Sequence, residues 1–321
     1  MKKILSVICA VLLLVSLTAC GNAGGNKADG KYTIGICQLI THDALDAATK
    51  GFKDAVIAGL GEENVTFKHQ DAAGKQSNCD TIVDGFVSEN VDLILANATA
   101  PLQSAATKTM TIPILGTSIT DYASALSIAN WTGTVGGNIS GTSDLAPLDE
   151  QAAMIKELFP DAKVVGLLYC SGEPNSVYQV TEMAKYLADL GYETENFSFV
   201  DANDLAAVTQ TACDGSDVIY IPTDNTAANN AEAIGNVVIP NKTPVVAGES
   251  GICSGCGVAT LSIDYYELGY ITGQMAVKVL KGEEKIDAMA VQFAPNVTKM
   301  YNQANCEALG VTIPEGYQPL G

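Results

Sequence analysis

The sequence predicts an α/β fold built of two doubly wound parallel-sheet lobes joined by a hinge. Short apolar runs, such as residues 91–97, suit strands buried on both faces of a sheet, and they alternate with segments whose apolar residues share one helical face. The alternation stops in a Gly-rich stretch at 134–144 and starts again after Pro147. Repeated strand–helix units indicate parallel sheets covered by helices, so two successive series of them indicate two lobes.

The first series begins near Lys31. Its strands are expected at 32–38, 65–69, 91–97 and 112–117. Its helices are expected at 41–60, around 79–86 and from Thr99 onward, where Pro101 lies in the first turn. The stretch 134–144 lacks a strong apolar face and is expected to be a crossover between the lobes.

The second series repeats this rhythm. Its strands are expected at 164–170, 197–200, 217–221, 243–247 and 258–263, and its helices around 148–158, 177–190 and 265–281. In open parallel sheets, ligands bind beyond the carboxyl ends of the strands. Two lobes that face one another would therefore place these strand ends around a shared cleft.

The first twenty residues have the order of an export signal. Lys2 and Lys3 precede an apolar run at 4–17 that is too short to span a bilayer, and Leu17-Thr-Ala-Cys20 resembles a bacterial lipobox. We therefore expect residues 1–19 to be a cleaved signal peptide. The alternative is an uncleaved anchor helix.

The segment that follows is expected to be a lipidated tether. Residues 20–30 are small, polar and Gly-rich, which is typical of a flexible linker. Acyl chains such as palmitate on Cys20 would anchor the body, since each buried methylene contributes about 0.8 kcal/mol. The predicted localisation is the extracytoplasmic face of the cell membrane.

The composition is that of an acidic globular body. Hydrophobic residues make up 47% of the chain and charged residues 17%, and the net charge is −19, which becomes −21 when Lys2 and Lys3 leave with the signal. Such a surface is repelled by phosphate backbones, which argues against binding to nucleic acid.

Cysteine and histidine give little support to a metal site or a cofactor. Seven cysteines remain after the signal and Cys20, and the buried-thiol interpretation suits those in apolar runs. Cys253 and Cys256 form the one paired spacing, for which a local disulfide or two idle thiols is favoured over a metal site. With His42 and His69 as the chain's two histidines, a His-based triad or multi-His centre is not expected.

Polar side chains collect at the predicted strand ends. They comprise Gln38, His42, Thr99, Thr117, Ser118, Glu173, Asn175, Ser176, Asp224, Asn225, Glu249, Asp264 and Tyr265. No Lys or Arg is among them, which argues against a polyphosphate ligand. An ammonium group would pair with a carboxylate, and helix N-terminal amides would hold a ligand carboxylate, so the set suits a zwitterion such as an amino acid. Helix capping is an alternative for Thr99, Asn175, Ser176 and Asp264, and closing a turn is the alternative for Asp224 and Asn225.

Three short motifs are specific: Glu173-Pro-Asn-Ser176, Pro222-Thr-Asp-Asn225 and Ile263-Asp-Tyr-Tyr266. Through them the sequence resembles one family of ABC-transporter substrate-binding lipoproteins, which includes tryptophan- and tyrosine-binding members and has the type I periplasmic-binding-protein fold. The stretch from Gly136 to Asp144 also resembles that family, although Thr117-Ser-Ile-Thr-Asp121 lacks a proline that the family often has after the Asp.

The resemblance implies a two-lobed cleft with three crossovers between the lobes. It implies an N-terminal lobe of 31–142 plus 262–288 and a C-terminal lobe of 143–261 plus 289–321. Carried over residue by residue, the ligand-contacting candidates are Thr99, Ser176, Asp224, Asn225 and Asp264.

The predicted function is capture of a small zwitterion, an aromatic or apolar amino acid, by a monomeric binding protein that delivers it to ABC permease and ATPase subunits. No enzyme activity, cofactor or metal is expected. The alternatives are a sugar- or nucleoside-binding protein on the same scaffold, or a secreted hydrolase that uses the carboxylates of Glu173, Asp224 and Glu249. A surface adhesin or a receptor for a sensor kinase is a third possibility.

Overall fold

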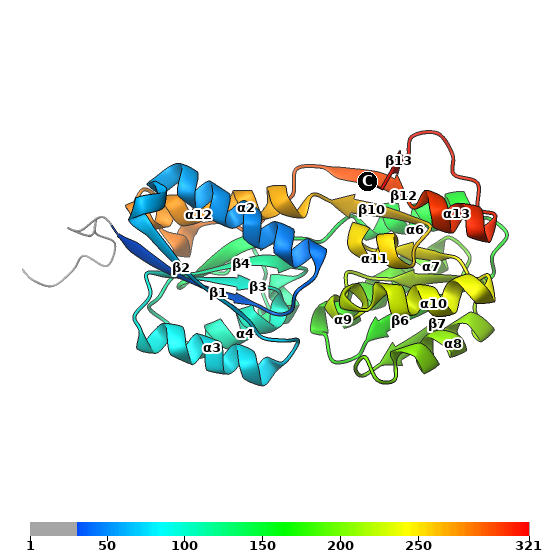
Figure 1. Cartoon of the computed structure of the whole chain (residues 1–321), viewed down its shortest axis with the longest axis horizontal. Coiled ribbons are helices and arrows are strands. Elements are labelled where there is room, and N and C mark those ends of the chain that lie inside the picture. The colour runs from blue at the N-terminus through cyan, green and yellow to red at the C-terminus, as the bar shows by residue number, and fades with distance from the viewer. Residues whose placement is uncertain (1–30, 321) are drawn as a thin grey trace, which may run out of the picture.

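The computed structural model describes residues 31–320 and contains two lobes, each built around one sheet (Figure 1). No helix in this part of the chain is long and apolar enough to cross a membrane. The expected α/β architecture with two parallel-dominated sheets is confirmed.

The N-terminal lobe contains a six-stranded sheet with the order β11-β5-β4-β3-β1-β2. All of its strand pairs are parallel. The strands are β1 (Tyr32–Gln38), β2 (Val65–Asp71), β3 (Leu93–Asn97), β4 (Ile114–Ile119), β5 (Ile139–Ser143) and β11 (Gln292–Phe293). The helices are α2 (Asp43–Leu60), α3 (Gln76–Ser88), α4 (Thr99–Lys108), α5 (Tyr122–Ala125) and α12 (Tyr265–Lys281), with 3₁₀ turns at η1 (Glu62–Asn64) and η2 (Ile286–Ala288).

Strand β3 shows how both faces of this sheet become buried. Leu93 and Leu95 pack in a cluster with residues of α2 and α12, whereas Ile94 and Ala96 pack with residues of α3 and α4. Side chains alternate between the two faces of a strand, so a strand covered on both sides is apolar at successive positions. This explains the continuous apolar run that predicted the strand.

The C-terminal lobe contains a seven-stranded sheet with the order β13-β12-β10-β9-β8-β6-β7. Only β10 and β12 pair antiparallel within it. The strands are β6 (Val164–Cys170), β7 (Glu193–Phe199), β8 (Val218–Ile221), β9 (Val245–Ala247), β10 (Ala259–Ile263), β12 (Val297–Tyr301) and β13 (Gln318–Pro319). The helices are α6 (Leu148–Leu158), α7 (Pro174–Asp189), α8 (Leu205–Gly215), α9 (Asn225–Asn229), α10 (Ala231–Asn241), α11 (Ser250–Gly255) and α13 (Gln303–Leu309).

Three short segments connect the sheets: 144–147 between β5 and α6, Asp264 between β10 and α12, and 294–296 between β11 and β12. The first two lie within two residues of the expected lobe divisions. The third lies beyond the expected division at 288/289, because β11 adds a two-residue edge strand to the first sheet.

The expectation that 134–144 is a crossover is wrong for 139–143, which form the buried strand β5. Its residues are small or polar, but their hydroxyls have partners inside the lobe. Thr142 Oγ1 lies 2.8 Å from Thr272 Oγ1, and Ser140 Oγ donates to the Met289 carbonyl at 3.1 Å. A strand that satisfies its hydroxyls in this way can be buried without an apolar sequence.

Helix α12 returns to the first lobe and packs against α2 at very short range (Figure 1). A Cβ on Gly269 would lie 1.9 Å from the Ala48 carbonyl oxygen, and one on Gly51 would lie 2.0 Å from the Tyr266 carbonyl oxygen. The two backbones therefore approach more closely than any side chain at these positions would permit. This contact fixes the start of α12, and with it Tyr265, beside the start of α2.

Candidate functional site

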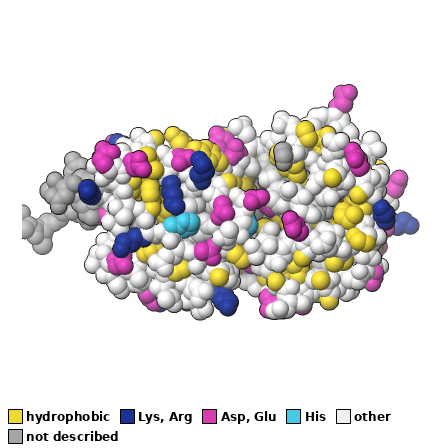
Figure 2. All heavy atoms as spheres, in the orientation of Figure 1, with side chains coloured by type: hydrophobic (Ala, Val, Ile, Leu, Met, Phe, Trp, Pro, Cys, Tyr) yellow, Lys and Arg dark blue, Asp and Glu magenta, His cyan; other side chains and the backbone are white. Residues whose placement is uncertain are grey.

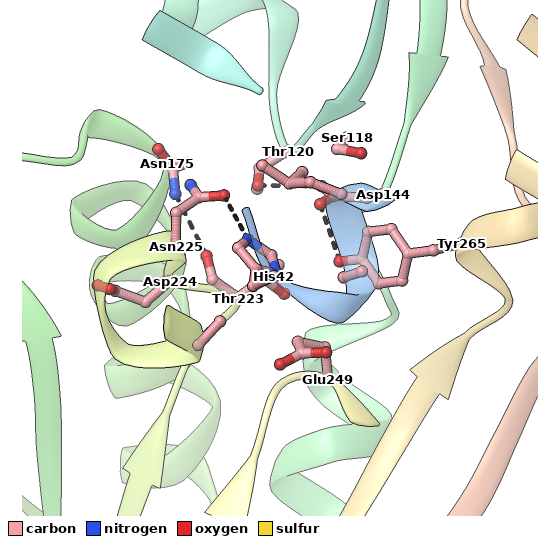
Figure 3. Close-up of a pocket in the computed structure, with 13 residues that line it drawn as sticks. His42, Ser118, Thr120, Asp144, Asn175, Thr223, Asp224, Asn225, Glu249 and Tyr265 are labelled. Carbon is pink, nitrogen blue, oxygen red and sulfur yellow. Dashed lines mark hydrogen bonds between the residues drawn. The ribbon is translucent and has the colours of Figure 1, made fainter. Parts of the chain in front are cut away.

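A small cavity lies between the lobes, where strand ends of both sheets meet the first two crossovers (Figure 3). Its volume is about 10 Å³, which is roughly the space needed by one water. The lining residues are His42, Ala44, Leu45, Ser118, Thr120, Asp144, Asn175, Thr223, Asp224, Asn225, Ala228, Glu249 and Tyr265. On the face of the molecule shown in Figure 2, several acidic side chains lie near the junction of the lobes.

One hydrogen bond joins the lobes directly across this cavity. His42 precedes the first residue of α2, and its Nε2 lies 3.2 Å from Asn225 Oδ1 at the start of α9 (Figure 3). Because the two residues belong to different lobes, this contact exists only while the cleft is closed. It identifies the described arrangement as a closed one.

Ser118 lies at an irregularity in β4, where the register with β5 shifts between Gly116 and Ile119. Its φ is 56°, in the left-handed region that non-glycine residues seldom adopt. Its side chain is 6% exposed, and its Oγ has no hydrogen-bond partner within the part of the chain described. The unusual backbone and the unsatisfied hydroxyl both occur where the residue faces the cavity.

Asp144 is buried at the start of the first crossover. Its Oδ1 accepts a hydrogen bond from Thr120 Oγ1 at 3.1 Å, and its Oδ2 accepts one from the Tyr265 hydroxyl at 3.0 Å. Burial raises the pKa of its carboxyl to about 6, and the negative charge of Glu249 adds to that effect. The Tyr265 bond also ties the first crossover to the helix that follows the second.

The C-terminal lobe contributes two further buried carboxylates. Asp224 Oδ1 accepts from the Ala227 amide at 2.8 Å, and its Oδ2 accepts from the Cys170 amide at 2.7 Å. Glu249 accepts from the amides of Gly251 and Ile252. Each is the capping residue of the helix that follows it, α9 or α11.

Burial raises the pKa of both capping carboxyls. For Asp224, the nearby charge of Glu173 adds to the rise, whereas for Glu249 the positive charge of His42 opposes it. A helix N-terminus stabilises negative charge, so these two carboxylates have partners of their own.

Glu173 lies behind the lining and organises it. Its Oε2 accepts from Asn225 Nδ2 at 2.7 Å and from Asn175 Nδ2 at 3.1 Å, and its Oε1 accepts from the amide of Thr226 at 2.8 Å. Asn175 Nδ2 also reaches the Thr223 carbonyl at 3.2 Å. One carboxylate therefore orients both asparagines that face the cavity.

The structure brings part of the predicted set to the cavity. The predicted residues that line it are His42, Ser118, Asn175, Asp224, Asn225, Glu249 and Tyr265. The predicted residues outside the lining are Gln38, Thr99, Thr117, Glu173, Ser176 and Asp264.

Each residue outside the lining has another role in the fold. Gln38 bonds with Thr49 and Asp46 beneath α2, and Thr117 Oγ1 accepts from Thr142 Oγ1 at 3.2 Å. Thr99 is buried as the first residue of α4, and Ser176 hydrogen-bonds with Asp224.

Asp264 lies exposed in the second crossover. Its Oδ1 accepts from the Glu267 amide at 2.9 Å, which makes it the cap of α12.

Sequence reasoning missed six lining residues: Ala44, Leu45, Thr120, Asp144, Thr223 and Ala228. The strand-end argument would have found Thr120 and Asp144 if β4 and β5 had been given their observed ends, since each follows a strand directly. Ala44, Leu45 and Ala228 are the apolar part of the lining, and their sequence pattern does not differ from that of ordinary core packing.

Metal ligands and disulfides are not part of this site. Within residues 31–320, no group of three or more His, Cys, Asp or Glu side chains is arranged to hold a metal ion. Cys253 and Cys256 are both buried free thiols, and so are Cys37, Cys79 and Cys170.

Comparison with known proteins gives one consistent result. Residues 33–318 match the family described as ABC transporter substrate binding protein. The chain is 36% identical over 294 residues to a tyrosine-binding protein of Clostridioides difficile, covering 88% of this chain and 85% of that protein.

Two solved structures differ in how well they superpose. A Streptococcus pneumoniae ABC domain in complex with L-Trp is 30% identical, covers 90% of this chain and 100% of its own, and has a TM-score of 0.86. A ligand-free, open substrate-binding protein with adhesive properties from Clostridium difficile is 33% identical, covers 90% and 99%, and has a TM-score of 0.69. The described arrangement of lobes is thus closer to the ligand-bound neighbour, in agreement with the contact between His42 and Asn225.

Proposed function

Since this chain belongs to the family of ABC transporter substrate-binding proteins, we propose that it is the extracytoplasmic solute-binding lipoprotein of an ABC importer. It captures a small zwitterion, an aromatic or apolar amino acid, in the cleft between the lobes. It then delivers this ligand to the permease and ATPase subunits. The body is a monomer held at the cell membrane by lipid on Cys20.

The observation that carries this proposal is the cavity that both lobes line. Ala44, Leu45 and Ala228 form an apolar part suited to a ligand side chain, while Asp144 offers negative charge to an ammonium group. Ligand pockets commonly combine an apolar lining with a few placed polar groups. The relatives whose names mention tyrosine and L-Trp support the amino-acid class.

The small cavity volume implies that the lobes move. A cavity of about 10 Å³ is too small for any amino acid. The ligand therefore enters when the lobes part at the three crossovers, and the bound cleft is wider than the one described. A ligand that contacts both lobes shifts the equilibrium toward closure by its differential affinity for the closed state.

Of the alternative functions, the hydrolase is excluded and the sugar- or nucleoside-binding protein is left to experiment. Members of this family bind substrates for transport and are not enzymes, so the secreted hydrolase is set aside. A sugar or nucleoside ligand remains an outcome of the test below. Tyr265 is the one aromatic side chain in the lining, and its hydroxyl is bonded to Asp144.

The test is isothermal titration of the mature protein after bound ligand has been removed by unfolding and refolding. We expect heat and a raised thermal midpoint with one or more aromatic or apolar amino acids among the twenty. Binding of glycine or alanine alone would contradict the aromatic or apolar assignment. Heat with ribose, glucose or adenosine and none with amino acids would establish the sugar or nucleoside alternative instead.

The anchor is tested separately in the cells that express the full chain. We expect the wild-type protein in the membrane fraction and Cys20→Ala in the soluble or secreted fraction, since one substitution removes the acyl attachment site. Cys306→Ala is the matched control, because it removes a buried free thiol of the second lobe. Membrane association of the Cys20→Ala protein equal to that of wild type would contradict lipidation at this residue.

A further inference from the structure

The three carboxylates of the cavity are not equivalent. Asp224 and Glu249 each accept two backbone amides at the start of a helix, so their negative charge is compensated by the fold. Asp144 accepts no hydrogen bond from a helix N-terminus: its partners are the neutral hydroxyls of Thr120 and Tyr265 and its own backbone amide. Asp144 is therefore the carboxylate whose charge still lacks a partner.

Among the described residues, 31–320, no cationic side chain is placed to serve Asp144. The chain contains no arginine, and no lysine lines the cavity. His42 is the one basic residue of the lining, and it contacts Asn225, while its positive charge opposes the rise in the pKa of Glu249. A buried charge without a partner is costly, so a cationic group supplied from outside the chain would stabilise this part of the cleft.

Ser118 supplies an independent sign of a missing partner at the same place. Its Oγ is buried and unsatisfied, and it lines the same cavity. Figure 3 shows Ser118 beside Asp144 on the N-terminal-lobe side of the cavity, above the ring of Tyr265. The Asp144 amide donates to the Ile119 carbonyl at 3.1 Å, which holds the ends of β4 and β5 together. Leaving a buried hydroxyl unpaired costs about 1–3 kcal/mol, which a ligand donor at this point would recover.

We propose that Asp144 binds the ammonium group of the ligand and that Ser118 Oγ accepts a second hydrogen bond from the same group. The assignment deepens the proposed function and rests on it. It gives the bound zwitterion a direction, with its cationic end toward the strand ends of the first lobe and the first crossover. Asp224 and Glu249 then shape the opposite wall without binding the ligand's charge.

The first test compares ligands that differ in one charged group. The probes are L-tyrosine, its deaminated analogue 3-(4-hydroxyphenyl)propanoate and its decarboxylated analogue tyramine, with the L-tryptophan series as a second set. Each is titrated into the ligand-stripped full-length mature protein. We expect the deaminated analogue to bind at least about 30-fold more weakly than the amino acid, because removing one partner of a buried charge pair leaves the other uncompensated.

The second test uses substitutions that keep the shape of the side chains. Asp144→Asn is expected to weaken the amino acid by at least about 30-fold while leaving the deaminated analogue nearly unchanged, so that the preference for an amine is lost. Ser118→Ala is expected to weaken the amino acid by roughly fivefold, the contribution of one net hydrogen bond. Circular dichroism and a thermal midpoint show whether each variant is folded.

Matched controls separate this role from general damage. Asp204→Asn changes a partly exposed carboxylate of the second lobe that accepts from the Val200 amide in the turn before α8, and Ser127→Ala changes another serine with positive φ, 55°, at an exposed position. Both are expected to bind as the wild type does.

The outcomes distinguish this assignment from the function on which it rests. If an amino acid binds but its deaminated analogue binds equally well, or if folded Asp144→Asn keeps the preference for the amine, the assignment is wrong and the proposed function stands. If none of the twenty amino acids binds, both are wrong.

Discussion

Replacing Asp144 by Asn is expected to stabilise the ligand-free protein at pH 8, although the same change removes the proposed amine site. Burial raises the pKa of this carboxyl from 3.8 to about 6. Each pKa unit corresponds to about 1.4 kcal/mol, so holding the side chain ionised in the folded state costs about 3 kcal/mol at pH 8. Asn is neutral at every pH and removes this cost.

The sign follows from linkage. Because the folded-state pKa lies above the unfolded value, the folded protein binds a proton more tightly than the unfolded chain does. The stability from this group is complete below pH 3.8 and is lost as the pH rises through about 6. Asp224 and Glu249 have raised pKa values for the same main reason, burial, so each also lowers the stability of the folded protein as the pH rises. Only the difference between variant and wild type isolates Asp144.

The assay is a thermal midpoint of ligand-stripped wild type and Asp144→Asn at pH 5 and pH 8. Asn keeps one acceptor for the hydroxyls of Thr120 and Tyr265, so we subtract about 1 kcal/mol for the bond it weakens. The remaining gain of about 2 kcal/mol corresponds to a rise of roughly 4–8 °C at pH 8. At pH 5 the carboxyl still costs about half as much as at pH 8, because the folded protein takes up a proton that the unfolded chain has mostly lost, so the gain is expected to shrink to less than about 1 kcal/mol. An equal midpoint at pH 8, or a gain that is the same at both pH values, would refute the reasoning.

Three further substitutions test other parts of the account. His42→Ala removes the direct hydrogen bond to Asn225. We expect roughly fivefold weaker ligand binding by titration and a larger radius of gyration of the ligand-free protein in X-ray scattering. Unchanged values would show that this bond does not hold the cleft closed. Asp264→Ala removes the cap of α12, so we expect the free energy of unfolding in urea to fall by about 1 kcal/mol, with a ligand affinity within twofold of wild type. A large loss of affinity would show that Asp264 belongs to the ligand site. Gly269→Ala puts a methyl group 1.9 Å from the Ala48 carbonyl oxygen, so we expect the free energy of unfolding to fall by about 3 kcal/mol or more. Gly85→Ala is the tolerated control, because its added methyl meets nothing within 4 Å. Equal thermal midpoints for the two variants would contradict the close contact of α2 with α12.

The layered architecture was predictable because its signal is local. A strand such as β3, covered on both faces, needs an apolar residue at every position, and an amphipathic helix such as α2 repeats its apolar residues every three to four positions. Strand β5 was missed because its burial depends on partners far away in the sequence. Thr142 is matched by Thr272, 130 residues later, and nothing in the stretch 139–143 itself indicates that partner.

The site was predictable to the extent that it follows strand ends. Asp224 and Glu249 were found because each directly follows a recognisable buried strand, and Asp144 was missed together with β5. In this structure the side-chain oxygens of Asp224 and Glu249 cap the helices that follow them, a role that the strand-end argument did not assign to either residue. Whether a carboxylate at a strand end is compensated by amides or left for a ligand depends on the backbone that follows it, which the sequence pattern does not specify.

The most direct measurement is a crystal structure of the mature protein with the amino acid that binds most tightly. We expect the ligand to contact both lobes, with its amine nitrogen within hydrogen-bonding distance of an Asp144 carboxylate oxygen and of Ser118 Oγ. A ligand held by one lobe alone would contradict capture between the lobes. An amine directed at Asp224 or Glu249 would contradict the assigned orientation.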